Sequence, residues 1–291
     1  MNSLRNCPAP AKLNLFLHVT GRRADGYHLL ESAFQLIDLG DTLHFTSRRD
    51  GRIVRINALA QVPESVDLTV RAAKLLQEKS GCEQGVELTL EKKIPMGGGL
   101  GGGSSDAATT LLALNRLWGI GMKRVDLIEM GLSLGADVPF FLFGHNAFAR
   151  GIGEALWPLQ SDSRFFAVIF PGVEVPTRRI FEAPELTRDT VPIKMADFCA
   201  DALKPELPRF EDGFGHNDLE PVAVAHYPEV GAALAWLGRF GPARMSGSGA
   251  CVFCAFSSRA AAEESLVGIP DRWSGWACAS LTHHPLASWA A

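Results

Sequence analysis

The stretch PMGGGLGGGSSD (residues 95–106) places six glycines between an expected strand at residues 86–92 and an expected helix that begins near Ser105. Glycine adopts positive φ angles at little cost and lets backbone N–H groups approach a ligand closely. The N-terminus of the following helix adds unpaired N–H groups and the positive end of a dipole. The stretch therefore predicts a phosphate site, with Ser104 and Ser105 as helix caps whose hydroxyls can also reach a magnesium ion.

Three phosphate-binding motifs compete for this glycine run. A Walker A loop needs Gly-Lys-Ser/Thr, but no lysine follows Gly103. Gly97, Gly99 and Gly102 match a dinucleotide-binding fingerprint, yet residues 122–134 are expected to be helical where that fold needs a second parallel strand. A protein-kinase loop needs a VAIK strand and an HRD loop, and the sequence has neither. A flexible linker is the remaining alternative, and six glycines directly before a strong helix argue against it.

The hydrophobic pattern predicts strands and helices that do not alternate in simple βαβ order. Expected strands cover residues 11–19, 42–45, 51–56, 86–92, 165–170, 250–256 and 276–280. Expected helices cover residues 67–79, 105–118, 125–134, 217–226, 228–239 and 259–266. Pro158 and the polar run at 160–163 interrupt the pattern, so we expect two domains, residues 1–158 and 159–291.

The composition excludes several classes of protein. The 291 residues are 47% hydrophobic and 21% charged, which favours a folded chain with a sizeable core. A net charge of −4 argues against nucleic-acid binding. No signal peptide and no stretch long enough to span a membrane is evident. Only Cys251 and Cys254 have C-x-x-C spacing, and no second pair completes a zinc site, so reduced buried cysteines and a cytoplasmic location are expected.

Polar residues in apolar surroundings are the candidates for chemistry. Lys12 lies in an otherwise apolar strand with Asn14 on the same face, and a solvent-facing lysine at a sheet edge is the alternative. Asp137 precedes the apolar run VPFFLF; such a carboxylate is usually paired, hydrogen-bonded or functional, and a turn-forming aspartate is the alternative. Tyr27 and His28 follow a glycine turn, where a lone histidine is more often structural.

Three motifs of the chain occur in the order typical of the GHMP kinase superfamily. They are PAPAKLNLFL (residues 8–17), PMGGGLGGGSSDAA (residues 95–108) and ARMSGSGACVF (residues 243–253). The chain resembles that superfamily from residue 8 to about residue 285. Three further stretches are similar to its branch that phosphorylates a cytidine-diphosphate-linked methylerythritol in the non-mevalonate isoprenoid pathway. These are GRRADGYHLLESAFQLIDLGDTL (residues 21–43), GADVPFFLFG (residues 135–144) and HNDLEPVA (residues 216–223).

The resemblance implies a two-domain α+β GHMP kinase fold with the active site in the cleft between the domains. The N-terminal domain would be an α/β domain like ribosomal protein S5, and the C-terminal domain a ferredoxin-like α+β domain. The implied enzyme uses Mg²⁺ and transfers the ATP γ-phosphoryl group to the 2-hydroxyl of the methylerythritol moiety. Asp137 would be the general base on that hydroxyl, while Lys12 keeps the carboxylate ionised and orients the hydroxyl.

The same resemblance implies roles for the residues of the three motifs. The implied ATP-binding residues are Pro95, Met96, Gly97, Gly98, Gly99, Leu100, Gly101, Gly102, Gly103, Ser104 and Ser105. The implied substrate contacts are Asn14 and Thr177, with Tyr27 and His28 at the cytosine and Phe181 stacked on that base. The implied supporting loop is Ser246, Gly247, Ser248 and Gly249, which from the sequence alone can also be an ordinary tight turn.

One residue departs from the family pattern: Asp67 stands where asparagine is common near the adenine site. The resemblance supplies no acidic magnesium ligand, so the metal ligands stay unassigned. The expected partners are ATP and a cytidine-diphosphate-linked polyol, with no nucleic acid and no membrane, and the expected state is a monomer or homodimer.

Three alternative functions are weighed against this prediction. A homoserine-type GHMP kinase should lack the segment DGYH, and a non-catalytic nucleotide-binding regulator should lack Lys12 or Asp137. A nicotinamide oxidoreductase is disfavoured by the helix expected after the glycine run.

Overall fold

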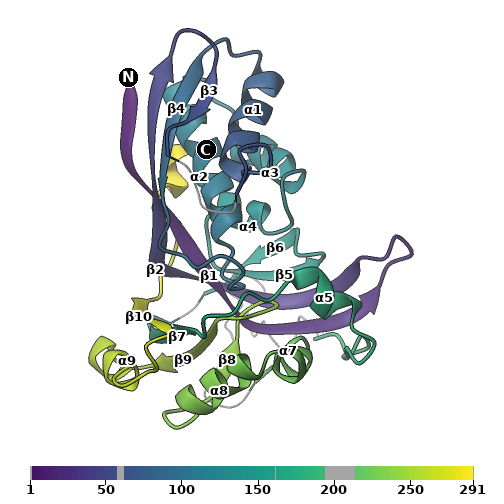
Figure 1. Ribbon diagram of the computed structural model, residues 1–291. Helices are drawn as coiled ribbons and strands as arrows, with labels where there is room; N and C mark the ends of the chain where they lie inside the picture. The colour runs from purple at the N-terminus through teal and green to yellow at the C-terminus, as the bar shows by residue number, and fades with distance from the viewer. Residues whose placement is uncertain (1, 58–61, 161, 194–213, 291) are drawn as a thin grey trace.

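Two β-sheets form the framework of the molecule (Figure 1). The computed structural model describes residues 2–57, 62–160, 162–193 and 214–290. The strands of the larger sheet are β1 (Ser3–Arg22), β2 (His28–Arg48), β3 (Ile53–Arg55), β4 (Gly85–Glu91), β5 (Ala147–Gly151) and β6 (Ala155–Pro158). The strands of the smaller sheet are β7 (Phe165–Phe170), β8 (Ala243–Met245), β9 (Val252–Phe256) and β10 (Ser274–Ala279).

The helices lie with one sheet or the other, as Figure 1 shows. Those with the larger sheet are α1 (Leu68–Ser80), α2 (Gly102–Leu117), α3 (Arg124–Leu132) and α4 (Val138–Phe143). Those of the C-terminal half are α5 (Thr177–Glu182), α7 (Glu220–His226), α8 (Pro228–Leu237), α9 (Arg259–Ser265) and the short 3₁₀ helix η2 (Ala287–Trp289). Among the described residues, no helix is both long and apolar enough to cross a bilayer.

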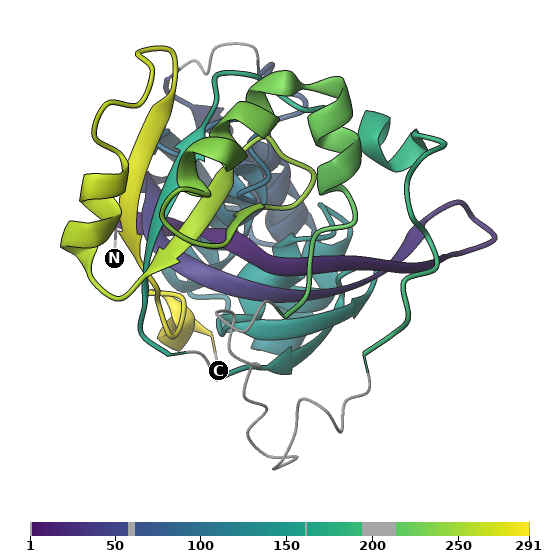
Figure 2. The ribbon, with the colours of Figure 1, turned by 90° about the horizontal axis from the view of Figure 1, so that it is seen from below.

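Strand β2 organises the larger sheet, because it pairs with three other strands. It runs antiparallel to β1 along most of its length, to β5 near its start and to β4 near its end. The smaller sheet is antiparallel throughout, in the order β10-β7-β9-β8. Seen from below in Figure 2, α7 and α8 lie in front of this smaller sheet, and the β1–β2 hairpin extends past it to the side.

The alternation of residues along β1 explains how one strand serves two layers. Ala11, Leu13 and Leu15 pack into a core shared with β7 and β9 of the smaller sheet. Lys12 and Asn14 point to the opposite face, as the period of a strand requires. Both are buried, with 3% and 1% of their surface exposed. The alternative of a solvent-facing lysine is therefore wrong.

Helix α2 forms the centre of the N-terminal core. Nearly all its side chains from residue 105 to residue 117 are buried, in contact with α1, α4 and the larger sheet. The chain returns to this core at its end, where Leu286 and Ala290 pack among the same residues. The expected division at residues 158/159 lies between the end of β6 and the start of β7, and it stays a prediction.

The structure corrects the expected start of α2. The helix begins at Gly102 rather than near Ser105, and its N-cap is Gly101, with a φ of 72° and no side-chain cap bond. The Ser105 hydroxyl donates instead to the carbonyl oxygen of Pro10 at 2.7 Å, so capping by Ser104 or Ser105 is wrong. The helix starts earlier because glycine can adopt the left-handed conformation that turns the chain into it.

Other expectations were confirmed or incomplete. The expected strand at 165–170 is β7, and the segment at 122–134 is largely helical, as α3. The short elements β5, β6, β8, α4 and α5 were not expected from the pattern. Cys251 and Cys254 are buried free thiols, as predicted, whereas Cys199 lies outside the described residues.

The buried His284 side chain makes the stability of the fold sensitive to acid. Its Nδ1 accepts a hydrogen bond from the amide of Leu286 at 3.0 Å, and it is fully buried. Burial, and secondarily the positive charge of Arg124, lower the pKa of His284 from 6.5 to about 3. The neutral ring is therefore favoured in the folded protein, and its contribution to stability is full above pH 6.5 and lost as the pH falls toward 3.

We predict that His284→Asn weakens this acid sensitivity. Asparagine can still accept from Leu286 but does not titrate, so the loss in free energy of unfolding between pH 7 and pH 5 should shrink by about 2 kcal/mol. Urea denaturation at the two pH values measures this loss. The exposed His226→Asn variant is the matched control, and an unchanged pH dependence in His284→Asn would contradict the prediction.

Candidate active site

A cavity of about 1200 Å³ lies against the larger sheet, where segments from both halves of the chain meet. A single small-molecule site typically has about 300–1000 Å³, so this cavity has room for more than one ligand. Its walls come from β1, the β1–β2 hairpin, the start of α1, the glycine run, the start of α4, α5 and the turn before β9. Segments that are far apart in the sequence therefore meet around it.

The glycine run enters this cavity with its carbonyl groups already bound. The carbonyl oxygens of residues 97 and 98 accept hydrogen bonds from the amides of Ala250 and Cys251 at 3.2 and 3.0 Å. That of Gly99 accepts from the Ser246 hydroxyl at 3.1 Å, and that of Leu100 from the Lys12 amide at 3.0 Å. Four consecutive carbonyls thus point toward β1 and the turn before β9.

The N–H groups of this run are left for a ligand. In a trans peptide the N–H points opposite to the preceding carbonyl, so the amides of residues 98–101 point away from the segments that hold those carbonyls. Within the described part of the chain, these four amides donate to no protein acceptor. The first amides of α2 also lack intrahelical acceptors, and residues 97–104 line the cavity. This arrangement can bind an anion such as phosphate.

Two glycines allow this close packing. Gly99 has a φ of 73°, and a Cβ there would lie 2.1 Å from the carbonyl oxygen of Ser246. Gly101 has a φ of 72°, and its Cβ would lie 3.0 Å from the ring of Phe141 and 3.2 Å from the Lys12 side chain. Both positions therefore require glycine for backbone conformation and for space.

Lys12 and Asp137 form an ion pair in the cavity wall. Lys12 Nζ lies 3.5 Å from Asp137 Oδ2, and the side chains are 4% and 34% exposed. Asp137 directly precedes α4, but its carboxylate makes no cap hydrogen bond. A turn-forming or capping aspartate would not need to keep its carboxylate exposed beside Lys12, so this alternative does not explain the position of Asp137. The pair presents an accessible proton acceptor next to a buried positive charge.

A chain of hydrogen bonds holds Lys12 in place. Its ammonium donates to Asn14 Oδ1, and Asn14 Nδ2 donates to the Ser32 hydroxyl at 2.8 Å. Ser32 in turn donates to the carbonyl oxygen of Phe16 at 2.6 Å. Because each donor has a fixed acceptor, the lysine side chain has little freedom to leave the cavity wall.

The turn before β9 supports the glycine run from the other side. Ser246 accepts from the Asn14 amide and donates to Gly99, each at 3.1 Å. Asn217 Nδ2 donates to the carbonyl oxygens of Met245 and Gly247, both at 2.8 Å. This geometry is consistent with the expected supporting loop.

The remaining expected substrate residues lie at the far end of the cavity. Tyr27, at the tip of the β1–β2 hairpin, is 60% exposed. The His28 ring lies 5.0 Å from the Phe181 ring of α5, with an interplanar angle of 32°. The hydroxyl of Thr177, at the start of α5, forms a hydrogen bond of 2.8 Å with the hydroxyl of Ser248. Burial, then the charges of Arg188 and Arg22, lower the pKa of His28 below its ordinary value of 6.5.

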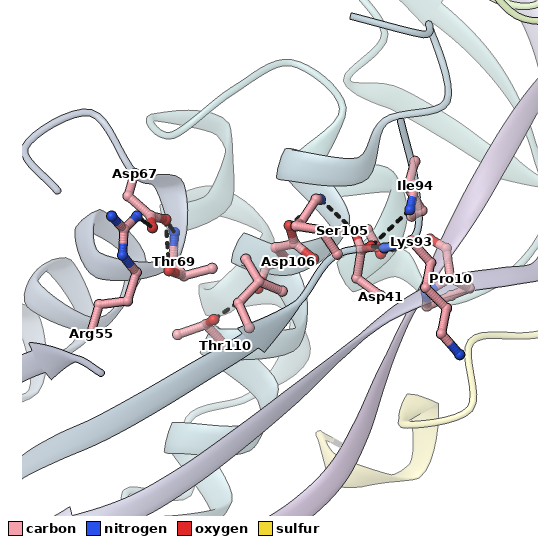
Figure 3. A network of polar contacts seen from close by, with 12 residues as sticks. Pro10, Asp41, Arg55, Asp67, Thr69, Lys93, Ile94, Ser105, Asp106 and Thr110 are labelled. Atoms are coloured by element: carbon pink, nitrogen blue, oxygen red, sulfur yellow. Dashed lines mark hydrogen bonds and ion pairs between the residues drawn. The ribbon is translucent and has the colours of Figure 1, made fainter. Parts of the chain in front are cut away.

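Asp67, the residue that departs from the family pattern, has a structural role at the opposite end of the cavity. Figure 3 shows its carboxylate turned toward Arg55 and Thr69. Oδ1 accepts from the Thr69 amide at 2.8 Å and from its hydroxyl at 2.6 Å, which caps α1, and Oδ2 pairs with Arg55. Asp67 lines the cavity, but its carboxylate is already engaged by the protein.

A second buried charge cluster lies below the first turn of α2, also in Figure 3. Lys92 Nζ contacts Asp41 at 2.5 Å and Asp106 at 2.8 Å. Burial raises the pKa of the Asp106 carboxyl well above its ordinary range. Among the described residues, no group of three or more His, Cys, Asp or Glu side chains is arranged to hold a metal.

Sequence reasoning missed several residues of this site. Ser32 and Arg188 carry no sequence signal, since each acts through a contact with a distant segment. Asn217 lies in the stretch HNDLEPVA, which carried a resemblance, but its role as a brace for the turn was not expected. Ser105 was expected at the phosphates, yet its hydroxyl is bound in the core.

Comparison with known proteins yields one family for the whole chain. Residues 67–145 match the family model described as GHMP kinases N terminal domain, and residues 199–273 match GHMP kinases C terminal. The chain is 58% identical to the 4-diphosphocytidyl-2-C-methyl-D-erythritol kinase of Herminiimonas arsenicoxydans, over 99% of this chain and 98% of that protein. It is 52% identical to the kinase of the same name from Aromatoleum aromaticum, over 99% and 98%.

Solved structures agree with this assignment. A crystal structure of 4-(cytidine 5'-diphospho)-2C-methyl-D-erythritol kinase is 34% identical, with a TM-score of 0.76 over 94% of this chain and 98% of that one. The homoserine kinase from Cytophaga hutchinsonii has a TM-score of 0.70 over 98% and 96%, at 19% identity. The second match shows that the fold is shared, and the expected two-domain α+β fold is confirmed.

We predict that Gly99→Ala disrupts the phosphate loop. The new Cβ meets backbone on a neighbouring turn, so a rotamer change cannot relieve the clash, and the fold should lose about 1–3 kcal/mol. Calorimetric titration should show ATP affinity reduced at least about tenfold, because the N–H groups move. For thermal stability the control is Gly103→Ala, whose Cβ would meet only Leu68 at 3.5 Å. Equal melting temperatures for the two variants would contradict the prediction.

Proposed function

The chain belongs to the GHMP kinase family, and from this we propose that it phosphorylates the 2-hydroxyl of 4-diphosphocytidyl-2-C-methyl-D-erythritol with ATP, giving the 2-phosphate and ADP. The names of relatives at 52–58% identity support this substrate, as does the crystal structure at 34%. The reaction belongs to the non-mevalonate pathway of isoprenoid precursors. A homoserine substrate has weaker support, since that relative shares only 19% of its residues.

The observation that carries the proposal is the position of the Lys12–Asp137 pair beside the glycine run in one cavity. Phosphoryl transfer needs positioning and charge stabilisation more than covalent chemistry from the protein. The amides of residues 98–101 and the start of α2 would bind the ATP phosphates. Asp137 would take the proton from the 2-hydroxyl as it attacks, and Lys12 would keep that carboxylate oriented and balance its charge.

A magnesium ion fits this arrangement as a companion of the nucleotide. Mg²⁺ usually keeps several waters and takes few protein ligands beside the phosphates. Ser104 lines the cavity at the first turn of α2, so its hydroxyl would be the protein contact, whereas the Ser105 hydroxyl is bound to Pro10. When bound, the ion would neutralise charge on the phosphates.

The far end of the cavity would recognise the cytidine part of the substrate. Tyr27 and His28 come from the hairpin and Phe181 from α5, and all three line the cavity. Aromatic rings can stack on the base, and a histidine edge can exchange hydrogen bonds with it. Asn14, beside Lys12, and Thr177, at the start of α5, also line the cavity and would contact the rest of the substrate.

We further propose the cytoplasm as the compartment, on the ground of the five free cysteines of the described chain, Cys7, Cys82, Cys251, Cys254 and Cys278. Burial raises the pKa of Cys7 and Cys254 to about 11, which makes these thiols poor nucleophiles. A monomer or homodimer remains the expected state.

We predict that Asp137→Asn keeps nucleotide binding and loses turnover. The amide cannot accept the hydroxyl proton, so kcat should fall about 10²–10⁴-fold while ATP affinity changes little. Coupled ADP-release kinetics and calorimetric ATP titration check the two parts. Asp162→Asn removes the same charge from an exposed site, and its activity should stay near that of the parent protein. Turnover of Asp137→Asn within twofold of the parent would exclude it as the base.

We predict that His28→Ala impairs substrate binding and spares the chemistry. Loss of the ring removes a polar contact and the support of Phe181, so KM for the cytidine substrate should rise about tenfold or more. KM for ATP should stay unchanged. The exposed His226→Ala variant is the control, and a normal KM for the cytidine substrate in His28→Ala would refute base recognition by His28.

A further inference from the structure

Arg188 makes a hydrogen bond that fixes the protonation of His28. Its Nε donates to Nε2 of His28 across 3.1 Å. A guanidinium group has five N–H donors and no acceptor, so Nε2 must present its lone pair. The proton of the neutral ring therefore resides on Nδ1. Within the described residues, Nδ1 makes no hydrogen bond, which leaves it available to a ligand in the cavity that His28 lines.

The rest of the guanidinium is anchored at the end of α5. Nη2 donates to the carbonyl oxygens of Phe181 and Ala183 at 3.1 and 2.7 Å, and Nη1 donates to that of Leu186 at 3.0 Å. These three carbonyls hold the plane of the group, which aims Nε at His28. The arginine thus connects the hairpin to α5, which lie beside each other in Figure 1. An arginine needed only to cap α5 would be satisfied by the three carbonyls.

The surroundings of His28 also keep it uncharged. Burial lowers its pKa most, and the positive charges of Arg188 and Arg22 lower it further. Arg22 itself donates to the carbonyl oxygen of Gly26 at 3.2 Å and is exposed. Because burial and the two cations Arg188 and Arg22 all disfavour the charged imidazolium, the neutral ring of His28 dominates at neutral pH.

We propose that Arg188 is a positioning residue that holds His28 as the Nδ1–H tautomer and thereby makes the site select cytosine over uracil. The inference rests on the proposed function, in which His28 meets the base. N3 of cytosine has a lone pair and can accept a hydrogen bond from Nδ1–H of His28. N3 of uracil carries a hydrogen and is a donor, so it cannot accept this bond. In the Nε2–H tautomer, Nδ1 of His28 would be an acceptor, and the site would prefer uracil to cytosine. Specificity then comes from a mismatch imposed on the wrong base as well as from a bond to the right one.

The tautomer can be observed without any substrate. Nitrogen-15 NMR of the ring distinguishes protonated from bare nitrogens, and the parent protein should show His28 with Nδ1 protonated and Nε2 bare. In Arg188→Met the lock is lost, and the two tautomers should become mixed. A parent protein with the proton on Nε2, or an Arg188→Met variant that keeps the pure Nδ1–H form, would overturn the proposal.

Kinetics with two substrates then test selectivity. The preference is the ratio of kcat/KM for the cytidine substrate to kcat/KM for its uridine counterpart. Arg188→Met should reduce this ratio about tenfold, the worth of one hydrogen bond, and leave KM for ATP unchanged. Arg188→Gln keeps an amide donor and should restore part of the ratio. Arg179→Met is the matched control, since Arg179 contacts Tyr227 and His226 rather than His28, and this variant should keep the parent ratio.

The outcomes separate the possible failures. If Arg188→Met raises KM for both pyrimidines equally, the arginine only supports α5 and the proposal is wrong. If the parent protein phosphorylates neither substrate, the proposed function fails, while the NMR result still decides the tautomer.

Discussion

The site depends on the contact between two glycine-rich turns, one from each half of the chain. The Ser246 hydroxyl stands between them, accepting from the amide of Asn14 and donating to the carbonyl oxygen of Gly99, each at 3.1 Å. No side chain larger than a hydrogen fits at Gly99. Because this contact and β1 together hold the carbonyls of residues 97–100, the amides on the other side are arranged before any phosphate arrives. Such preorganisation removes the cost of ordering a loop during binding.

Two lysines near this loop differ in how exposed their carboxylate partners are. Lys92 is shared by the carboxylates of Asp41 and Asp106, whose side chains are 0% and 3% exposed. Burial raises the pKa of Asp106, and the cluster joins β2, the end of β4 and α2. The Lys12 side chain is 4% exposed, against 21% for Lys92, and its carboxylate partner Asp137 is 34% exposed. Lys92 and Asp106 also line the cavity, but Asp137 is the most exposed carboxylate of the two clusters and thus the most accessible to a ligand.

The fold and the centre of the site were predictable from sequence because their signals are local. The alternation around Lys12 and Asn14, the glycine run and the order of three motifs each lie within a short stretch. What the sequence could not supply are contacts across long separations, such as Arg188 with His28 or Ser246 with Asn14, which are 160 and 232 residues apart. Short apolar runs such as VPFFLF also fit a strand or a helix equally well, and only packing on α2 and α3 decides for α4.

The departure at Asp67 shows how one changed residue is accommodated by its neighbours. Asparagine offers a donor and an acceptor, whereas aspartate offers acceptors only and adds a negative charge. A buried carboxylate without a partner would be costly, and Arg55, itself 7% exposed in its side chain, supplies the opposite charge. The other oxygen caps α1 through Thr69. Both oxygens are engaged by the protein, and the neighbouring Val62, Val66 and Leu68 form an apolar part of the cavity wall at the same end.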